Sequence, residues 1–307
     1  MNSQSCRPSV RVLIFRFLLR RLNVRVHTYL AVLFQLYLLW TLFQPSPAHA
    51  TTTDLLFTGI VFLSFCLVWR WDTLGIWLGY LYVGLFFFEA FQEGGWPSIG
   101  VFTAVLFLAY FALKLYPRNR AITLQFPLRG GVFYTVQGGA FPLLTNYHGA
   151  VVKAQSYACD FSQLNRWGTR ALGIFPSRLD RYAIYGATVC SPGNGVILRS
   201  LDGLADLPPG QMDLDNVAGN HVVIRLDGLD ANLLLAHLQN GSVSVKVGDR
   251  VSAGQLIGKV GNSGSTTEPH LHIHAQKQVT TGSGSEWAPV PIRFGSRWLV
   301  RNSLVRA

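Results

Sequence analysis

The sequence predicts an N-terminal all-α transmembrane region followed by an all-β domain with an antiparallel sheet or sandwich. The chain has 307 residues, which is enough for two domains of ordinary size. Its residues are 50% hydrophobic and only 13% charged, and the apolar ones concentrate in the first 120 positions. From residue 121 onward, short β-branched runs alternate with Gly, Asn, Asp and Pro turns, a pattern typical of short strands.

The N-terminal region opens with a basic segment, residues 1–25, that holds six arginines. Arginines beside apolar segments are typical topology determinants facing anionic lipid, and no aromatic-interleaved basic stripe indicates a nucleic-acid partner. Residues 26–116 then form a predicted membrane region of about four helices in contact with the lipid bilayer. Its apolar runs are residues 26–43, 55–69, 73–91 and 96–116. Buried helices of a soluble core would show polar faces at helical period, which these runs lack.

The side of the membrane on which the C-terminal domain lies is ambiguous from the sequence. The basic N-terminus favours a cytoplasmic start, and four crossings would return the chain to the cytoplasm. An odd number of crossings, for instance if the short run 55–69 does not span, would export the domain. The SPAHA stretch, residues 46–50, also offers a signal-peptidase site after Ala50, although the long basic segment before it favours an uncleaved first helix.

The C-terminal part is divided into a linker, residues 117–131, and a β domain, residues 132–307. Runs such as GVFYTV, NHVVIRL and NLLLAHL predict its strands, and Gly-bearing turns separate them. Cys159 and Cys190 could form a disulfide if this domain is exported, but the sequence does not show whether their Cα atoms are close enough.

Three of the eight histidines stand at alternate positions in the segment TTEPHLHIHAQ, residues 266–276. On a β-strand, His270, His272 and His274 would share one face, about 7 Å apart. Such a row can hold a metal ion with one imidazole while another reaches a water molecule. A solvated histidine-rich strand, or core histidines satisfied by hydrogen bonds, would give the same pattern.

The segment GNSGSTTEPHLHIH resembles the signature of the lysostaphin-type zinc endopeptidases, approximately G-N-[ST]-G-x-[ST]-x-x-P-H-L-H. Upstream, YGATVCSPGNGVI, GNHVVIRL and AHLQNGSVSVKVGDRVSAGQLIGKVGNSG are similar to earlier strands of that family, in the same order. The resemblance covers about residues 130–276 and implies the lysostaphin-type peptidase fold with a zinc ion (Zn2+) as cofactor.

The resemblance also implies roles for individual histidines. His272 would be a zinc ligand, and His270 would be a catalytic histidine beside the metal. His237, in LLLAHL, matches the second catalytic histidine, which polarises the scissile carbonyl or stabilises the oxyanion. Without the resemblance, a histidine in such a leucine-rich run would be read as structural.

The remaining zinc ligands depart from the family pattern. Relatives carry His-x-x-x-Asp, and here Asp160 is the aspartate but Ser156 stands in the histidine position. We expect His148, in LLTNYHGAVV, to supply the third ligand from a loop that folds back; otherwise it would be a surface-loop residue. His274 occupies a place where relatives commonly have a carboxylate, and is expected to lie behind the ligands or in solvent.

The resemblance implies a zinc-dependent endopeptidase in which metal-activated water attacks an amide of peptidoglycan stem or cross-link peptides, and the apolar runs predict that it is membrane-anchored. The alternative is a non-catalytic module with a degenerate metal site that binds peptidoglycan or activates an amidase, which Ser156 motivates. The hairpin VKVGDRVSAGQLIGKVG also resembles biotinyl-type sandwiches and membrane-fusion adaptors, but no Met-Lys-Met attachment tripeptide is present. A regulatory protein partner remains unknown.

A cell-wall peptidase implies a location in the cytoplasmic (inner) membrane, multi-pass, with the peptidase domain on the extracytoplasmic, periplasmic side. Four crossings would place the domain on the cytoplasmic side. We expect export nevertheless, because the candidate site residues indicate a cell-wall peptidase.

Overall fold

The computed structural model describes residues 29, 33, 70, 72, 73, 120–140, 145–281 and 284–307 of the chain. Apart from single positions, the predicted basic segment and the four apolar runs lie outside these residues, as do Cys6, Cys66 and Ala50. Within the described part, we find no helix with the length and apolarity needed to span a bilayer.

The described C-terminal residues form an all-β domain with three short helical turns. The turns are α6 (His148–Val151), η2 (Lys153–Gln155) and η3 (Leu179–Arg181). The strands are β1 (Ile122–Leu124), β2 (Val132–Gln137), β3 (Cys159–Leu164), β4 (Thr188–Cys190), β5 (Gly195–Leu201), β6 (Asn220–Leu226), β7 (Asn232–Leu238), β8 (Arg250–Val251), β9 (Leu256–Lys259), β10 (Leu271–Thr281), β11 (Gly284–Val290), β12 (Ile292–Phe294) and β13 (Leu304–Arg306).

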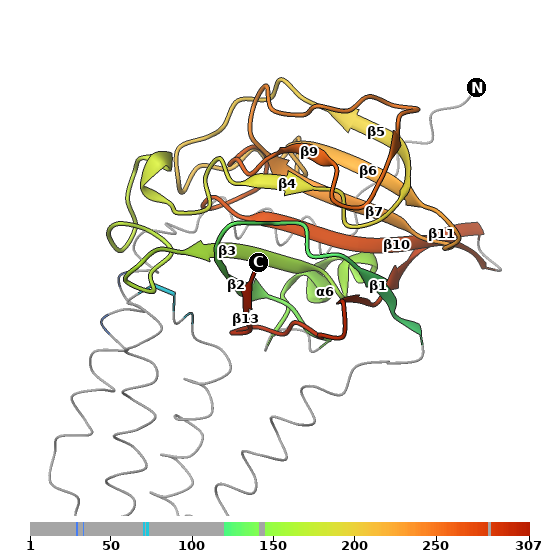
Figure 1. The fold of residues 1–307 in the computed structure, drawn as a ribbon, viewed down its shortest axis with the longest axis horizontal. Coiled ribbons are helices and arrows are strands. Elements are labelled where there is room, and N and C mark those ends of the chain that lie inside the picture. Colours follow the sequence, from blue (N-terminus) through green and yellow to red (C-terminus); the bar gives the residue numbers. More distant parts are fainter. Residues whose placement is uncertain are drawn as a thin grey trace, which may run out of the picture.

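A nine-stranded sheet dominates the domain (Figure 1). Its order is β13-β2-β3-β10-β7-β6-β5-β8, with β11 paired to the far end of β10. All pairings in this sheet are antiparallel, which confirms the predicted antiparallel β domain. Strands β4 and β9 form a small antiparallel ribbon, and β1 and β12 form a parallel pair. The long strand β10 lies between β3 and β7, at the centre of the sheet.

The core lies on one face of the sheet, where the β4–β9 ribbon covers it. Successive side chains of β10 point to opposite faces of the sheet, and Leu271 and Ile273 point into this core, where both are fully buried. Val189 of β4 and Ile257 of β9 pack against them from the ribbon. Full burial of an aliphatic side chain of this size stabilises the fold by roughly 1.5–3 kcal/mol. This apolar layer fixes which side of β10 turns inward, so the intervening histidines must occupy the other face.

The segment 117–131, predicted as a linker, contains β1, and Leu124 and Leu128 are buried in the core. A three-residue strand between prolines is too short for its periodicity to be recognised in the sequence. The possible disulfide is not formed: Cys159 and Cys190 are both buried free thiols, one on β3 of the main sheet and the other on β4 of the ribbon.

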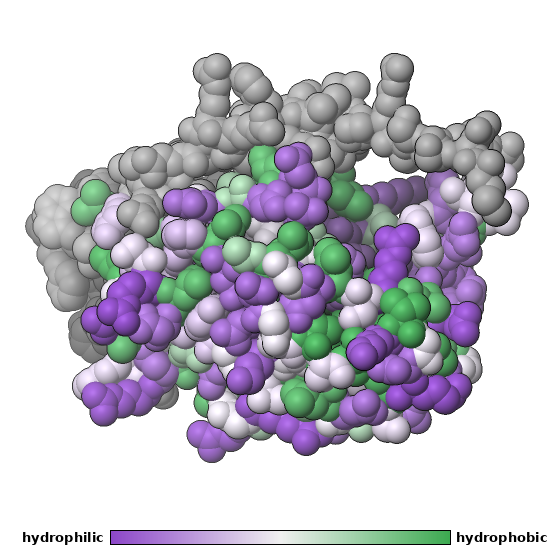
Figure 2. Space-filling view, turned by 90° about the horizontal axis from the view of Figure 1, so that it is seen from above, coloured by the Kyte–Doolittle hydropathy of each residue, from purple (hydrophilic) through white to green (hydrophobic). Residues whose placement is uncertain are grey.

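The face of the molecule in Figure 2 shows hydrophobic residues interspersed with hydrophilic ones. Isolated apolar side chains of this kind are ordinary on a water-facing surface, whereas interaction sites gather them into larger patches. This face therefore lacks a continuous apolar surface among the residues that Figure 2 colours.

Two glycines with positive φ offer a matched test of the packing around the loop before β6. Gly219 (φ +57°) would place a Cβ 2.2 Å from the backbone oxygen of Ser263, whereas Gly228 (φ +67°) has nothing within 4 Å of that position. We expect Gly228→Ala to destabilise the chain by the backbone term alone, about 1–2 kcal/mol. Gly219→Ala should add an overpacking cost of about 1–3 kcal/mol. Urea unfolding of both full-length variants checks this, and equal losses would contradict the packing described here.

Candidate metal centre

The centre begins with a cross-strand pair. Asp160 on β3 and His272 on β10 stand directly opposite each other in the antiparallel register. Opposed residues have Cβ atoms about 5 Å apart, so their side chains meet above the sheet. Nδ1 of His272 lies 2.8 Å from Oδ1 of Asp160. Both side chains are buried on the face of the sheet that points away from Leu271 and Ile273.

His148 reaches this pair from a loop. Its Nε2 atom lies 2.7 Å from Oδ2 of Asp160, and its ring centroid is 4.6 Å from that of His272. Eleven residues separate His148 from Asp160 in the sequence, and the turns α6 and η2 fold them back toward the start of β3. This return agrees with the expectation for His148, and the structure shows the two residues together.

Asn146 holds this returning loop in place. Its side-chain Nδ2 donates to the carbonyl oxygens of Ser156 and Ala158, at 3.0 and 3.1 Å, and also to that of Gly139. Its Oδ1 accepts the backbone N–H of His148 at 3.0 Å. Asn146 is 1% exposed, so these bonds are shielded from water. This role of Asn146 was not predicted from the sequence, although an asparagine at the start of a turn commonly hydrogen-bonds to the backbone two residues further on.

Ser156, in the position where relatives carry a histidine, turns to its own loop. Its hydroxyl donates to the carbonyl oxygen of Lys153 at 2.7 Å. The close approach of Gly149 explains part of this geometry, because a Cβ there would lie 2.9 Å from Cα of Ser156. Ser156 therefore does not face Asp160, and His148, which lies earlier in the chain, stands beside that carboxylate instead.

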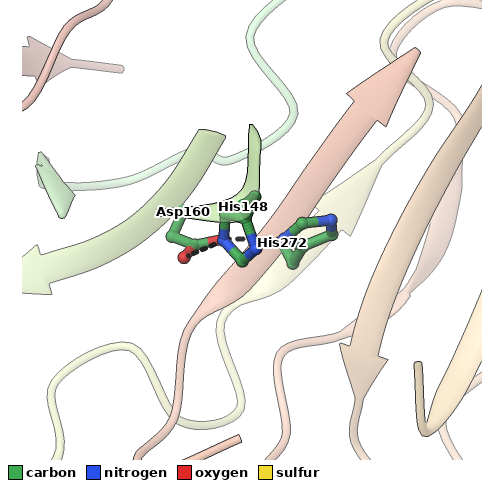
Figure 3. Close-up of side chains that lie close together, drawn as sticks. All are labelled: His148, Asp160 and His272. Atoms are coloured by element: carbon green, nitrogen blue, oxygen red, sulfur yellow. Dashed lines mark hydrogen bonds and ion pairs between the residues drawn. The ribbon is translucent and has the colours of Figure 1, made fainter. Parts of the chain in front are cut away.

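The three side chains point toward one another in Figure 3. One possible ligand atom from each of His148, Asp160 and His272 lies within 4.8 Å of the other two. Two imidazole nitrogens and a carboxylate oxygen are the donor set of a catalytic zinc site with three protein ligands. The residues present therefore fit a zinc ion.

Electrostatics keep the carboxylate charged. Burial alone would raise the pKa of Asp160, but the nearby His148 and His270 and the hydrogen bonds from His148 and His272 hold it well below its ordinary value. For His148, burial disfavours the cation and would lower the pKa. The charge of Asp160 and its hydrogen bond outweigh burial and raise the pKa of His148. An ionised carboxylate at the base of the centre favours a cation there.

His270 lies immediately before β10 and beside the ligand set. Its Nδ1 lies 2.9 Å from the carbonyl oxygen of Glu268. Because a carbonyl oxygen can only accept, Nδ1 carries a proton and donates it to Glu268, which leaves Nε2 as the nitrogen open to other partners. That Nε2 is 3.8 Å from Oδ1 of Asp160. The side chain is 15% exposed, more than that of His272, so it is placed to meet a substrate.

His237 reaches the same place through an irregularity in β7. A β-bulge shifts the register with β6, so that β7 has one extra residue between Leu235 and Leu238. Both of these leucines are in the core. His237 has φ +63°, a conformation that costs a non-glycine residue on the order of 1–3 kcal/mol. The bulge turns its ring away from the core, 4.8 Å from that of His270 between centroids. A leucine-rich run gives no sequence signal for such a bulge.

A hydrogen bond orients the ring of His237. Its Nδ1 donates to the carbonyl oxygen of Ser263 at 2.9 Å, which leaves Nε2 as the nitrogen without a proton. Burial, reinforced by the neighbouring His270 and His272, lowers the pKa of His237 well below its ordinary value. The ring is therefore neutral in this environment.

His274 lies behind the ligands. Its Nδ1 is 2.9 Å from Nε2 of His272, and it is 4% exposed, so it is buried and not solvated. Burial, with contributions from His272 and His148, lowers the pKa of His274 well below its ordinary value, so its ring is neutral. Because Nδ1 of His272 donates to Asp160, Nε2 of His272 accepts the proton of His274 Nδ1. Partners of this kind fix the orientation of a metal-binding imidazole. His221 lies apart from the group, with Nδ1 donating to the carbonyl oxygen of Gly219.

Comparisons with known proteins find sequence matches within this domain. Residues 178–283 match the sequence profile described as "Peptidase family M23". This range includes His237, His270 and His272, whereas His148 and Asp160 precede it. A stretch of 51 residues is 45% identical to the glycyl-glycine endopeptidase ALE-1 of Staphylococcus capitis, covering 17% of this chain and 13% of that protein.

Solved structures to which part of the chain is similar include a zinc-containing peptidase from Vibrio cholerae, at 23% identity over 50% of this chain and 37% of that chain, with a TM-score of 0.31. Lysostaphin in solution is 22% identical over 50% of this chain and 47% of its own, with a TM-score of 0.30. The alignment thus spans less than half of each of these relatives. The assignment rests on the sequence matches and not on these superpositions. This chain contains a peptidase family M23 domain.

Proposed function

We propose that this protein is a membrane-anchored, zinc-dependent endopeptidase that cleaves peptidoglycan stem or cross-link peptides. The observation that carries the proposal is the convergence of His148, Asp160 and His272, with His270 and His237 beside them. The similarity to a glycyl-glycine endopeptidase supports a peptide bond as the target. Membrane anchoring follows from the apolar runs between residues 26 and 116, and an extracytoplasmic domain is where such a substrate would be met.

His148, Asp160 and His272 would hold the zinc ion. When bound, zinc supplies Lewis acidity and makes a water molecule nucleophilic near neutral pH. His274 holds the ring of His272 through the contact between Nε2 and Nδ1. The carboxylate of Asp160 lies between the two histidines, so it fixes the spacing of the ligand set.

His270 and His237 would handle protons and developing charge. The Nδ1 proton of His270 is committed to Glu268, so its Nε2 can take a proton from the nucleophile and later deliver it to the leaving amine. His237, held by Ser263, offers its other nitrogen to the same space. Because its pKa is low in the free site, this ring would take up a proton only as negative charge develops on the attacked amide, and would then donate it to that oxygen. The two rings are close enough to act on a single peptide group.

The alternative of a non-catalytic module was motivated by the serine at position 156. The position of His148 removes that motive, because a histidine from the preceding loop stands within hydrogen-bond distance of Asp160. A peptidoglycan-binding or amidase-activating role would not need five histidines gathered around one carboxylate.

The ligand assignment predicts different outcomes for two neighbouring substitutions. We expect the full-length protein to bind one zinc ion. His148→Ala should weaken zinc binding by at least about tenfold, because one of three protein ligands is removed. Ser156→Ala is the matched control and should leave the affinity unchanged, since that hydroxyl bonds to Lys153. Competition with a chromophoric chelator measures both, and loss of zinc in Ser156→Ala but not in His148→Ala would contradict the assignment.

The assignment of His270 predicts that chemistry and metal binding separate. His270→Ala should retain zinc while kcat for cross-linked muropeptides falls by about 10²–10⁴-fold, the usual contribution of a general acid–base group. His221→Ala, outside the group, serves as the control and should keep full activity. Chromatographic analysis of muropeptide products, with metal analysis of the same samples, makes the comparison. Undiminished turnover by His270→Ala would exclude the proposed chemistry.

A further inference from the structure

Four charged side chains beside the candidate centre join two parts of the chain that are far apart in sequence. They are Arg70, Asp72, Arg170 and Glu268. Arg70 donates from Nε and Nη2 to the two carboxylate oxygens of Asp72, at 3.1 and 2.8 Å, and from Nη1 to Oε1 of Glu268. Arg170 donates from Nε to both oxygens of Glu268, at 3.1 and 2.9 Å. Glu268 therefore binds one arginine of its own domain and one from 198 residues earlier.

Asp72 anchors this early segment on β3. It is 0% exposed, its carboxylate accepts the hydroxyl of Ser162 at 3.1 Å, and its backbone oxygen accepts the N–H of Arg170 at 2.9 Å. Ser162 follows Asp160 by two residues on β3, so the two side chains share one face of the strand. In Figure 1, the short coloured segment near residue 72 lies beside the end of β3. The docked segment thus contacts the strand that carries a candidate zinc ligand.

Glu268 connects the same cluster to His270. Its backbone oxygen accepts from Nδ1 of His270 at 2.9 Å and from the hydroxyl of Thr266 at 2.8 Å. Oγ1 of Thr266 is itself 3.1 Å from that Nδ1. The ion pairs on the Glu268 side chain therefore fix the backbone group that sets the proton position and the orientation of the His270 ring.

The cluster is balanced in charge and largely buried. It holds two positive and two negative side chains, and Asp72, Arg170 and Glu268 are at most 4% exposed. Burial would raise the pKa of Glu268, but Arg170 and Arg70 outweigh it and lower that pKa to about 2, so the carboxylate is ionised at neutral pH. A buried charge that loses its partner is strongly unfavourable. Removal of Arg70 would force Asp72 or Glu268 to move.

We propose that Arg70 and Asp72 are positioning residues of the candidate peptidase site, holding the Glu268–His270 turn in place against β3. Residues that precede the domain by some fifty positions in the sequence thus complete the site without touching the substrate. The catalytic part of this inference rests on the proposed function. The docking itself does not, because it concerns the geometry of His270 whether or not the protein hydrolyses peptides.

The test compares full-length Arg70→Gln with a control pair of the same design. Arg178 and Asp180 also pair two residues apart, but their side chains are 74% and 56% exposed and away from the cluster. For Arg70→Gln we expect kcat for cross-linked muropeptides to fall by about tenfold to a hundredfold, the cost of a small misplacement of a catalytic group, with KM and zinc content unchanged. Arg70→Lys keeps the charge and should recover part of the loss. Arg178→Gln should match the unmodified protein.

A second readout does not require hydrolysis. Diethyl pyrocarbonate acylates accessible imidazole nitrogens, and mass spectrometry of the peptide containing His270 gives the rate at that residue. We expect the rate to rise several-fold in Arg70→Gln and to stay unchanged in Arg178→Gln. If Arg70→Gln does not fold, the double variant Arg70→Gln/Asp72→Asn removes one charge of each sign, keeps the Arg170–Glu268 pair, and should show the same two effects.

The outcomes separate the two proposals. A protein that binds zinc but cleaves no muropeptide would overturn the proposed function, and the positioning role would then be decided by the modification rate alone. Unchanged kcat and an unchanged modification rate at His270 in Arg70→Gln and in Arg70→Gln/Asp72→Asn would overturn the positioning role. A fall in kcat accompanied by loss of zinc would also overturn it, because the defect would then lie in the ligand set.

Discussion

The antiparallel pairing of β3 with β10 is the constraint on which the rest of the site depends. It places Asp160 directly opposite His272 and puts the core residues Leu271 and Ile273 on the other face. Because side chains alternate along a strand, a slip of one residue would turn the imidazoles into the apolar layer and place Leu271 and Ile273 on the face of the metal centre. The hydrophobic core therefore does more than stabilise the domain: it specifies the register, and the register specifies which groups meet above the sheet.

Around this regular pair, the site is completed by irregular backbone. A returning loop pinned by Asn146 brings His148, and a bulge with positive φ turns His237 out of the core face of β7. Such local departures are costly, and they persist where surrounding contacts over-determine them. Here the contacts are the hydrogen bonds to Ser263 and to the start of β3. The sheet holds Asp160 and His272 rigidly, and the loop and the bulge orient His148 and His237 toward them.

The sequence predicted what depends on periodicity and on a recognisable motif. Alternate histidines indicated one face of a strand, and the structure shows that face at the centre of an antiparallel sheet. It could not predict the bulge at His237, because the leucines around it fit a regular strand equally well. Nor could it predict that Glu268, a variable position within the motif, would bind Arg70, since no local pattern encodes an ion pair across 198 residues. The short strand β1 was not predicted, because its three residues are too few to show a periodicity.

The docking of Asp72 against β3 also bears on membrane topology. Residue 72 and the peptidase domain must share one side of any bilayer, so the chain between them crosses an even number of times or not at all. If the predicted runs 73–91 and 96–116 both cross, their two crossings cancel and leave the sidedness of the domain unchanged. That sidedness is then decided upstream of Arg70, by whether one or both of the runs 26–43 and 55–69 traverse the lipid. With a cytoplasmic N-terminus, an exported domain would require that only one of these two runs crosses, so the number of crossings before Arg70 would decide the side on which the domain lies.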